Sequence, residues 1–265
     1  MRERVYKERT DHGPISLYHH DSKGTIFPCH WHDEYELLYF HKNTAILKIE
    51  NQSYVMPEGS VAIVNPGELH TVASFESSGC RLSALVCKLS DVQEHYINLQ
   101  DDNSLIVRIF ETYQTQKNSY LAVKGMIYQL FYHLQTEDKV KPLVNSPAAN
   151  QNMKRVLTYM EENYFEAITL EDMARKARFS KYHFIRVFKQ YTDNTPQKFL
   201  NEIRISKAKE ILKTGSVDIT NTALQVGFEN VSYFIKVFKG ITGQTPLKYQ
   251  KKDRQESVDL QDSTR

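Results

Sequence analysis

The chain has 265 residues, of which 40% are hydrophobic and 25% are charged, and its formal net charge is +2. This length suits two domains of ordinary size, and the composition excludes a wholly disordered chain. No apolar run approaches the roughly 18 residues that span a bilayer, and the charged start MRERVYKERT does not resemble a signal peptide. We therefore expect a cytoplasmic protein, not associated with a membrane, whose three cysteines stay reduced.

The charge is unevenly distributed along the chain. Residues 1–150 contain 14 Lys and Arg against 18 Asp and Glu, a net charge of −4, whereas residues 151–265 contain 20 against 14, a net charge of +6. A basic second half is typical of a protein that binds a polyanion. We predict a first domain at 1–140, a linker at 141–150, a second domain at 151–252 and a disordered polar tail at 253–265.

Short β-strands separated by turns are predicted for much of the first half. The segments lie at 35–40, 44–50, 52–56, 60–65, 70–75 and 81–89. Many short strands with tight turns between them indicate a sandwich or a barrel.

Two helices are predicted after this barrel, at residues 104–114 and 120–135. The second carries apolar residues at helical spacing: Leu121, Ile127, Leu130, Phe131 and Leu134. Such a surface either packs on the barrel or pairs with a second copy of the chain, and we expect a homodimer.

Four residues in the barrel could form a cluster. His30, His32 and Glu36 share the same parity near the first predicted strand, and His70 follows the turn at 65–67. Three imidazoles and a carboxylate suit a divalent transition metal such as zinc, iron, manganese or nickel.

The spacing of these residues resembles the two motifs of the cupin superfamily, a family of small β-barrels. Gly24, His30, His32 and Glu36 fit the first motif, and Gly59, Gly67 and His70 fit the second. The chain departs from the motifs at turns, with Asn43 in place of glycine, Asn65 in place of proline and Ser74 in place of asparagine.

A metal-free pocket for an organic effector is favoured over a bound metal, and a purely structural cluster of histidines is a third interpretation. Trp31, Tyr35 and Tyr39 lie close to the histidines in sequence and would suit a sugar or an aromatic ligand. The predicted effector residues are therefore His30, Trp31, His32, Tyr35, Glu36 and His70. An active metalloenzyme would also need an open coordination position and a general base, of which the sequence gives no sign, so we expect no enzymatic activity.

The second half contains an internal repeat. Residues 183–200 align with 233–250 at nine identical positions out of eighteen, and 169–179 resemble 218–228 in pattern. In each copy an N-cap residue, Thr169 or Asp218, precedes a short helix, and Ser180 or Asn230 precedes a second helix. Two short helices joined by a tight turn form a helix-turn-helix, whose second helix enters the major groove of DNA.

A long helix from Pro196 to Lys213 joins the two units, and Gly215 is predicted to end it. Helical spacing predicts a core side for each second helix, made of Phe184, Val187, Phe188 and Tyr191 in one unit and Phe234, Val237, Phe238 and Ile241 in the other. The opposite side carries the predicted DNA contacts, which are Tyr182, Ile185, Arg186 and Lys189 in the first unit and Ser232, Ile235, Lys236 and Lys239 in the second. An isoleucine there would suit a thymine methyl group, and Arg186 would suit guanine.

Residues 153–250 resemble the DNA-binding domain of the AraC/XylS family of bacterial transcriptional regulators. The segment GFENVSYFIKVFKGITGQTPLKY at 227–249 is close to that family's signature. The resemblance implies base contacts from Lys181, Tyr182, Ile185 and Arg186 and from Val231, Ser232, Ile235 and Lys236. Many members have arginine where this chain has Lys236, which weakens the expected guanine recognition by the second unit.

The resemblance also implies a cupin-like effector domain, dimerisation and contact with RNA polymerase. We therefore predict an α+β multidomain protein, with a cupin-like barrel and appended helices followed by an all-α domain of two helix-turn-helix units. Its predicted function is regulation of transcription at double-stranded promoter DNA, modulated by a small molecule such as a sugar. The alternative is a metal sensor or cupin metalloenzyme fused to a DNA-binding module.

Overall fold

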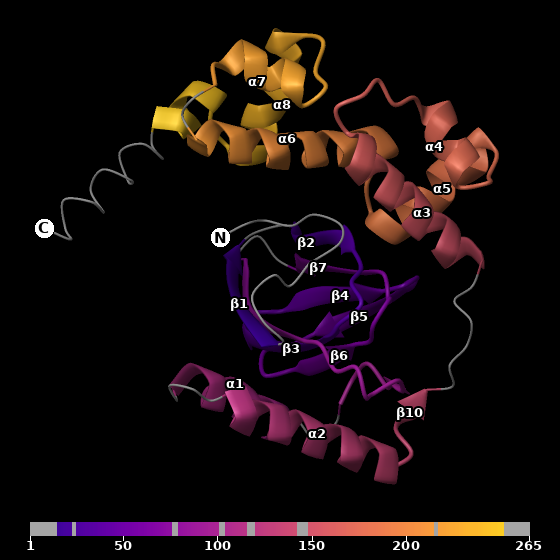
Figure 1. Ribbon diagram of the computed structural model, residues 1–265, viewed down its shortest axis with the longest axis vertical. Coiled ribbons are helices and arrows are strands. Elements are labelled where there is room, and N and C mark those ends of the chain that lie inside the picture. Colours follow the sequence, from indigo (N-terminus) through magenta and orange to yellow (C-terminus); the bar gives the residue numbers. More distant parts are fainter. Residues whose placement is uncertain are drawn as a thin grey trace, which may run out of the picture. The chain divides into compact units, whose positions relative to one another are not determined.

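The computed structural model describes residues 15–22, 25–75, 79–100, 104–115, 120–141, 148–214 and 217–251. The predictions for Gly24, Gly215, residues 142–147 of the linker and the tail lie outside these ranges. Contacts divide the chain after Lys154 into two compact units, which are described in turn (Figure 1). No helix within the described ranges is long and apolar enough to cross a membrane.

Two four-stranded antiparallel sheets form the first unit. One has the order β1-β8-β3-β6 and the other the order β2-β7-β4-β5. Their strands are β1 (Ile15–Ser22), β2 (Thr25–His30), β3 (Tyr35–Lys42), β4 (Ala45–Ile49), β5 (Gln52–Met56), β6 (Val61–Val64), β7 (His70–Ser74) and β8 (Cys80–Cys87). The six predicted strands match β3 to β8 within one or two residues, whereas β1 lies before the region in which strands were expected.

An apolar core fills the space between the two sheets. Leu38 and Phe40 of β3, Leu47 of β4 and Val72 of β7 are all fully buried in it. These β3 residues share the parity of Glu36, so that this carboxylate also points between the sheets.

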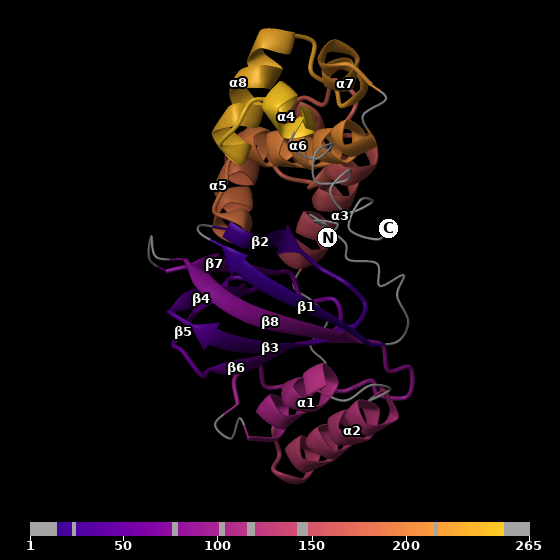
Figure 2. The same ribbon diagram turned by 90° about the vertical axis from the view of Figure 1, so that its left-hand side faces the viewer.

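The helices α1 (Ser104–Thr115) and α2 (Tyr120–Thr136) cover the outer surface of the sheet that contains β3 and β6 (Figure 2). Four of the five apolar α2 residues named above, Ile127, Leu130, Phe131 and Leu134, are buried in this packing. Leu121 is 78% exposed and does not belong to it. The apolar side of α2 therefore packs on its own barrel, and the argument for dimerisation from that side was wrong.

A short two-stranded ribbon is formed by one strand that precedes α1 and one strand that follows α2 in the sequence. Its strands are β9 (His95–Tyr96) and β10 (Val140–Lys141), which pair antiparallel. Ile63 of β6 donates its backbone N–H to Asn98 O at 2.7 Å, which fastens this ribbon to the barrel.

The second unit consists of helices. They are α3 (Ala148–Asn163, which begins before the division at Lys154), α4 (Leu170–Lys176), α5 (Lys181–Thr192), α6 (Pro196–Thr214), α7 (Ile219–Gln225) and α8 (Val231–Thr242). The pairs α4–α5 and α7–α8 are the two predicted helix-turn-helix units, and α6 lies between them (Figure 1). Proline begins α6 as predicted.

Three of the four predicted helix caps are confirmed by their hydrogen bonds. Thr169 forms a capping box with Asp172, Asp218 accepts from Asn221 N, and Asn230 accepts from Tyr233 N. Ser180 occupies the N-cap position of α5, but its side chain makes no capping hydrogen bond.

The predicted core sides of α5 and α8 are also largely confirmed. Phe184, Val187, Phe188 and Tyr191 are buried, as are Phe234 and Phe238. Val237 is half-buried, and Ile241 is 44% exposed, so the assignment of Ile241 to the core was wrong.

Candidate effector site and DNA-binding surface

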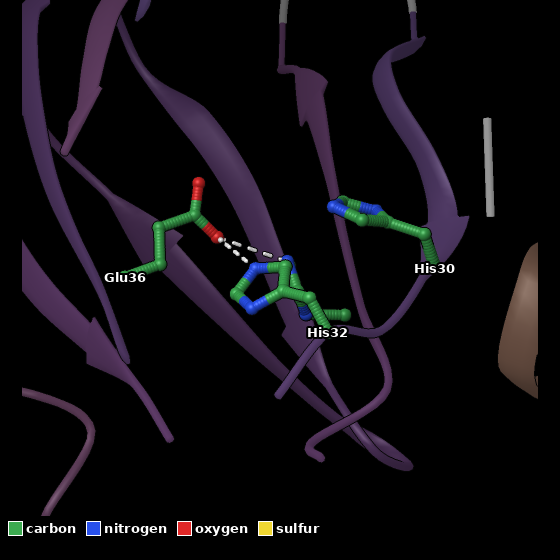
Figure 3. Close-up of side chains that lie close together, drawn as sticks. His30, His32 and Glu36 are labelled. Carbon is green, nitrogen blue, oxygen red and sulfur yellow. Dashed lines mark hydrogen bonds and ion pairs between the residues drawn. The ribbon is translucent and has the colours of Figure 1, made fainter. Parts of the chain in front are cut away.

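Four buried side chains meet between the two sheets of the first unit. His30 ends β2, His32 follows it, His70 begins β7 and Glu36 comes from β3 of the opposite sheet (Figure 3). Their ligand atoms all lie within 4.8 Å of one another, and each residue is at most 2% exposed. The predicted cluster is thus brought together, although β2 ends before Glu36, which therefore lies on a different strand.

Each imidazole is held by the backbone through its Nδ1 atom. His30 Nδ1 lies 2.8 Å from Pro28 O, His32 Nδ1 3.0 Å from Glu34 O and His70 Nδ1 2.9 Å from Glu68 O. Because a carbonyl oxygen can only accept, each Nδ1 carries a proton, and a neutral ring of this tautomer presents the lone pair of Nε2. This outer contact is the one that usually orients a metal-binding histidine.

Glu36 faces two of these Nε2 atoms. Its Oε2 lies 3.3 Å from His32 Nε2 and 3.0 Å from His70 Nε2 (Figure 3). His70 Nε2 is fully buried and has no well-directed hydrogen bond within the described part of the chain. A lone pair facing a carboxylate is unfavourable, so a proton or a cation must lie between them.

Electrostatics favour a charged carboxylate at Glu36. Burial alone would raise the pKa of Glu36, but the rings of His32 and His70, whose Nε2 atoms lie 3.3 and 3.0 Å from its Oε2, outweigh burial and hold this pKa well below its usual range. Burial lowers the pKa of His30 well below its usual value, and the nearby His70 and His32 lower it further. His30 is therefore neutral at physiological pH.

The donor set fits a divalent transition metal. Three Nε2 atoms and one carboxylate oxygen are common ligands of zinc, iron, manganese and nickel. With metal–ligand bonds of about 2.0 to 2.2 Å, the ligands of a tetrahedral site lie roughly 3.5 Å apart, so a contraction of about 1 Å would suffice. An ion held there would act as a Lewis acid toward an effector oxygen only if it accepted that oxygen as a fifth ligand.

Tyr35 does not belong to this site. It has the opposite parity to Glu36, packs against Phe131 of α2, and donates from its hydroxyl group to Glu94 O at 2.6 Å. Its assignment to the effector pocket was therefore wrong, because adjacent residues of a strand point to opposite surfaces. Trp31 is half-buried and separates the two histidines along the chain.

Asn43 stands where the cupin motif has glycine and Asn65 where it has proline, and the chain still forms a turn at both positions. Asn43 has φ of 62°, a left-handed conformation that asparagine tolerates better than most residues. Its side chain also donates to Gly79 O at 3.0 Å. Asn65 binds the backbone of Tyr96 on β9, with Asn65 Nδ2 donating to Tyr96 O and Tyr96 N donating to Asn65 Oδ1.

Sequence analysis missed Glu50, a further carboxyl group beside the cluster. Glu50 occupies the turn between β4 and β5, and its Oε1 accepts from Leu69 N at 3.2 Å, one residue before His70. Burial raises the pKa of this carboxyl group to about 7. Its signal in the sequence is weak, because a glutamate in a turn is usually solvated.

In the second unit, α5 presents most of its predicted DNA contacts to solvent. Tyr182 is 85% exposed, Lys181, Arg186 and Lys189 are exposed, and Ile185 is half-buried. Lys181 makes an ion pair with Glu171 of α4, so it would have to exchange this partner for DNA. Arg186 Nη2 lies 3.1 Å from His183 Nδ1, a contact that sequence analysis missed.

The second helix of the other unit, α8, also exposes most of its predicted DNA contacts to solvent. Ser232, Ile235, Lys236 and Lys239 are exposed and Val231 is half-buried. The residue that corresponds to His183 is Tyr233, whose hydroxyl group accepts from Asn201 Nδ2 of α6 at 3.1 Å. Equivalent positions in the two units therefore have different partners.

Residues of α6 and the second turn fasten this unit together. Arg204 of α6 donates to Tyr164 O at 2.7 Å and to Glu166 O at 2.8 Å, and its guanidinium lies over the ring of Phe228. A Cβ atom at Gly227, in the second turn, would lie 2.8 Å from Tyr164 O. The loop after α3 therefore contacts both the central helix and the second helix-turn-helix.

Comparisons with known proteins agree with both halves of this description. Residues 12–143 match the family model of the AraC-like ligand binding domain, and residues 173–252 match that of a helix-turn-helix domain. The chain belongs to the AraC family of transcriptional regulators. It therefore combines a cupin-like, sheet-rich ligand-binding domain with a helical DNA-binding domain.

Three relatives match between about two thirds and nine tenths of the chain. The uncharacterized regulator YdeC of Bacillus subtilis is 29% identical and covers 92% of this chain and 96% of its own. The raffinose operon regulatory protein RafR of Pediococcus pentosaceus is 26% identical and covers 66% of this chain and 65% of its own. The transcriptional activator RhaS of Escherichia fergusonii is 24% identical, and the match covers 83% of this chain and 86% of RhaS.

Proposed function

We propose that this AraC-family regulator binds specific promoter sequences through α5 and α8, and that a small molecule bound at His30, His32, Glu36 and His70 changes that binding. The observation that carries the proposal is the convergence of three oriented imidazoles and one carboxylate between the sheets of the ligand-binding domain. Buried polar groups that are not satisfied by each other are costly, so a ligand that satisfies them gains affinity.

A sugar or related polyol is the proposed class of effector. Hydroxyl groups donate hydrogen bonds, and the site offers Nε2 lone pairs and the oxygens of Glu36 as acceptors. The relative RafR regulates a raffinose operon according to its name, which supports a saccharide.

A metal sensor is the second candidate, favoured by the same donor set. The test is elemental analysis of gently purified protein beside a His30→Ala/His32→Ala variant, with His133→Ala, an exposed histidine of α2, as control. About one equivalent of metal that is lost only from the double variant would establish a metal site. Absence of metal after incubation with zinc, iron and manganese salts would favour the sugar, to be sought by thermal-shift screening.

DNA recognition is tested separately by selecting binding sites from random duplex DNA with the full chain. A single enriched motif is expected, with two parts read by the two units. Equal binding to all sequences, with a steep dependence on salt, would instead identify a non-specific DNA-binding protein.

We further propose that the regulator acts in the cytoplasm as a homodimer and contacts RNA polymerase at the promoter, as its resemblance to AraC/XylS regulators implies. The proposed linker between the effector domain and the DNA-binding domain is 141–150, of which Lys141 ends β10 and 148–150 belong to the start of α3. The mass in solution, measured by light scattering, tests the dimer.

A further inference from the structure

A buried polar network surrounds the side chain of Glu68, in the turn between β6 and β7. Its Oε2 accepts from Asn65 N at 2.9 Å, Asn65 Nδ2 at 3.1 Å and Asn98 Nδ2 at 2.7 Å. Its Oε1 lies 3.1 Å from Lys141 Nζ, which also donates to Asn98 Oδ1. Glu68 is 9% exposed, so loss of one of these partners would be expensive.

The network attaches the β9–β10 ribbon to this turn. Tyr96 N of β9 donates to Asn65 Oδ1 at 2.7 Å, and Asn98 Nδ2 also donates to Ile63 O at 2.9 Å. Ile97 N donates to Lys139 O at 2.9 Å, next to β10. Lys141 ends β10, and the chain then enters the proposed linker.

The same turn holds one histidine of the candidate effector site. Glu68 O accepts from His70 Nδ1 at 2.9 Å, so the backbone of Glu68 binds the cluster. The side chain of the same residue binds Lys141. His30 has the same burial as His70 and the same kind of Nδ1 contact, but its acceptor is Pro28 O on β2. The two histidines therefore differ in whether their anchor leads to the ribbon. They also differ in their contact with Glu36, whose Oε2 lies 3.0 Å from His70 Nε2; His32 shares this contact at 3.3 Å but is anchored by Glu34 O.

We propose that Glu68 is a positioning residue that relays the state of the His30, His32, Glu36 and His70 cluster to Lys141 at the start of the linker. The proposal rests on the cluster being the effector site. A ligand that moves His70 displaces Glu68 O, and the buried Glu68 side chain carries that displacement to the ribbon because its hydrogen bonds are too costly to break singly. This assigns the coupling to the β9–β10 ribbon, where Tyr96 also stacks on Phe131 of α2.

Amide hydrogen exchange of the full chain tests the relay without knowledge of the effector. His70→Ala should accelerate exchange of the Tyr96 and Ile97 amides at least about fivefold relative to the Phe40 amide, which binds Ser60 O in another part of the barrel. His32→Ala, which like His70→Ala removes a ring beside Glu36, and His30→Ala are the controls, and both should leave this ratio unchanged. Equal acceleration by His70→Ala and the controls, or acceleration by none of them, would overturn the proposal.

Double variants test whether Glu68 itself is required. In a Glu68→Gln background, which keeps the side-chain volume but removes the charge, His70→Ala should add little to the exchange of Tyr96 and Ile97. Fully additive effects would show that the coupling bypasses Glu68 and would overturn its role. If His70→Ala prevents folding, His70→Gln replaces it in both comparisons.

The proposed function is tested in the same variants by measuring how the effector changes their affinity for the selected DNA. If the cluster variants keep effector-dependent DNA binding while the exchange pattern is as expected, the result would count against the effector site while supporting the relay. If the cluster variants lose effector-dependent DNA binding while the exchange pattern fails, the result would count against the relay alone.

Discussion

At the scale of single residues, Arg186 is the strongest candidate for reading a base. It is exposed on α5, and a guanidinium can donate two hydrogen bonds to the major-groove edge of guanine. We expect Arg186→Ala to cost about 1 to 3 kcal/mol at the selected site and to relax preference at one base pair. Lys189→Ala, the control, should weaken binding to all sequences alike. Uniform weakening by both would exclude base reading by Arg186.

His183 should influence the same base pair through Arg186. Its Nδ1 atom accepts from the guanidinium, and its ring is held edge-on by Phe179 with centroids 4.6 Å apart. His183→Ala should relax preference where Arg186→Ala does, but by a smaller factor, while His183→Asn, which keeps an acceptor, should restore part of it. Quantitative binding to single-base variants of the selected site measures this. A change at a different base pair would contradict the link.

Gly227 is expected to be the least replaceable glycine of the second unit. Its φ is 84°, and a Cβ atom would lie 2.8 Å from both Tyr164 O and Phe165 O. Gly227→Ala should lower the free energy of unfolding by about 1 to 3 kcal/mol in urea titrations. Gly240→Ala, within α8 and with nothing near the added atom, should instead stabilise by up to about 1 kcal/mol. Equal effects would show that this close approach does not matter.

Residue types and spacing were enough to predict the His30, His32, Glu36 and His70 cluster, because its members occur at fixed positions near strand ends. They were not enough to exclude Tyr35, whose neighbour Glu36 points the other way. Side-chain partnerships such as His183 with Arg186, or Glu68 with Lys141, depend on distances that spacing does not encode.

At the scale of secondary structure, the two helices of the first helix-turn-helix unit differ in how they begin. Thr169→Ala removes the capping bond from Asp172 N to the Thr169 hydroxyl group, although the backbone bond from Thr169 N to Asp172 Oδ2 stays available, and should cost about 0.5 to 2 kcal/mol. Ser180→Ala removes no capping hydrogen bond and should cost less. Urea titrations of the two variants make the comparison, and a larger loss for Ser180→Ala would refute it.

The helices and most strands were predictable because their periodicity is strong. The boundaries of α1, α2 and α6 agree with prediction within one residue, and β5 agrees without any difference. The direction of an apolar side was less predictable, since α2 packs on its own sheet and Ile241 remains exposed. Periodicity identifies an apolar side but not its partner.

At the scale of the whole molecule, binding at the cluster should stabilise the effector domain. A ligand at about 100 times its dissociation constant adds roughly 2.7 kcal/mol to the stability of the folded state. If the site binds zinc, thermal unfolding of the wild-type chain should shift upward with added zinc, and that of His30→Ala/His32→Ala should not. His133→Ala should behave as the wild type, and equal shifts in all three would place binding elsewhere.

The turns of the two helix-turn-helix units each contain a residue with positive φ, but the two turns cannot be exchanged equally well. At the position that corresponds to Gly227, the first unit has Arg178, with φ of 56° and a full side chain. A copy of the second turn would therefore fit in the first unit, because glycine adopts this conformation freely. A copy of the first turn in the second unit would drive arginine into the carbonyl groups of Tyr164 and Phe165. The second turn can therefore replace the first, whereas the first turn cannot replace the second without a steric clash.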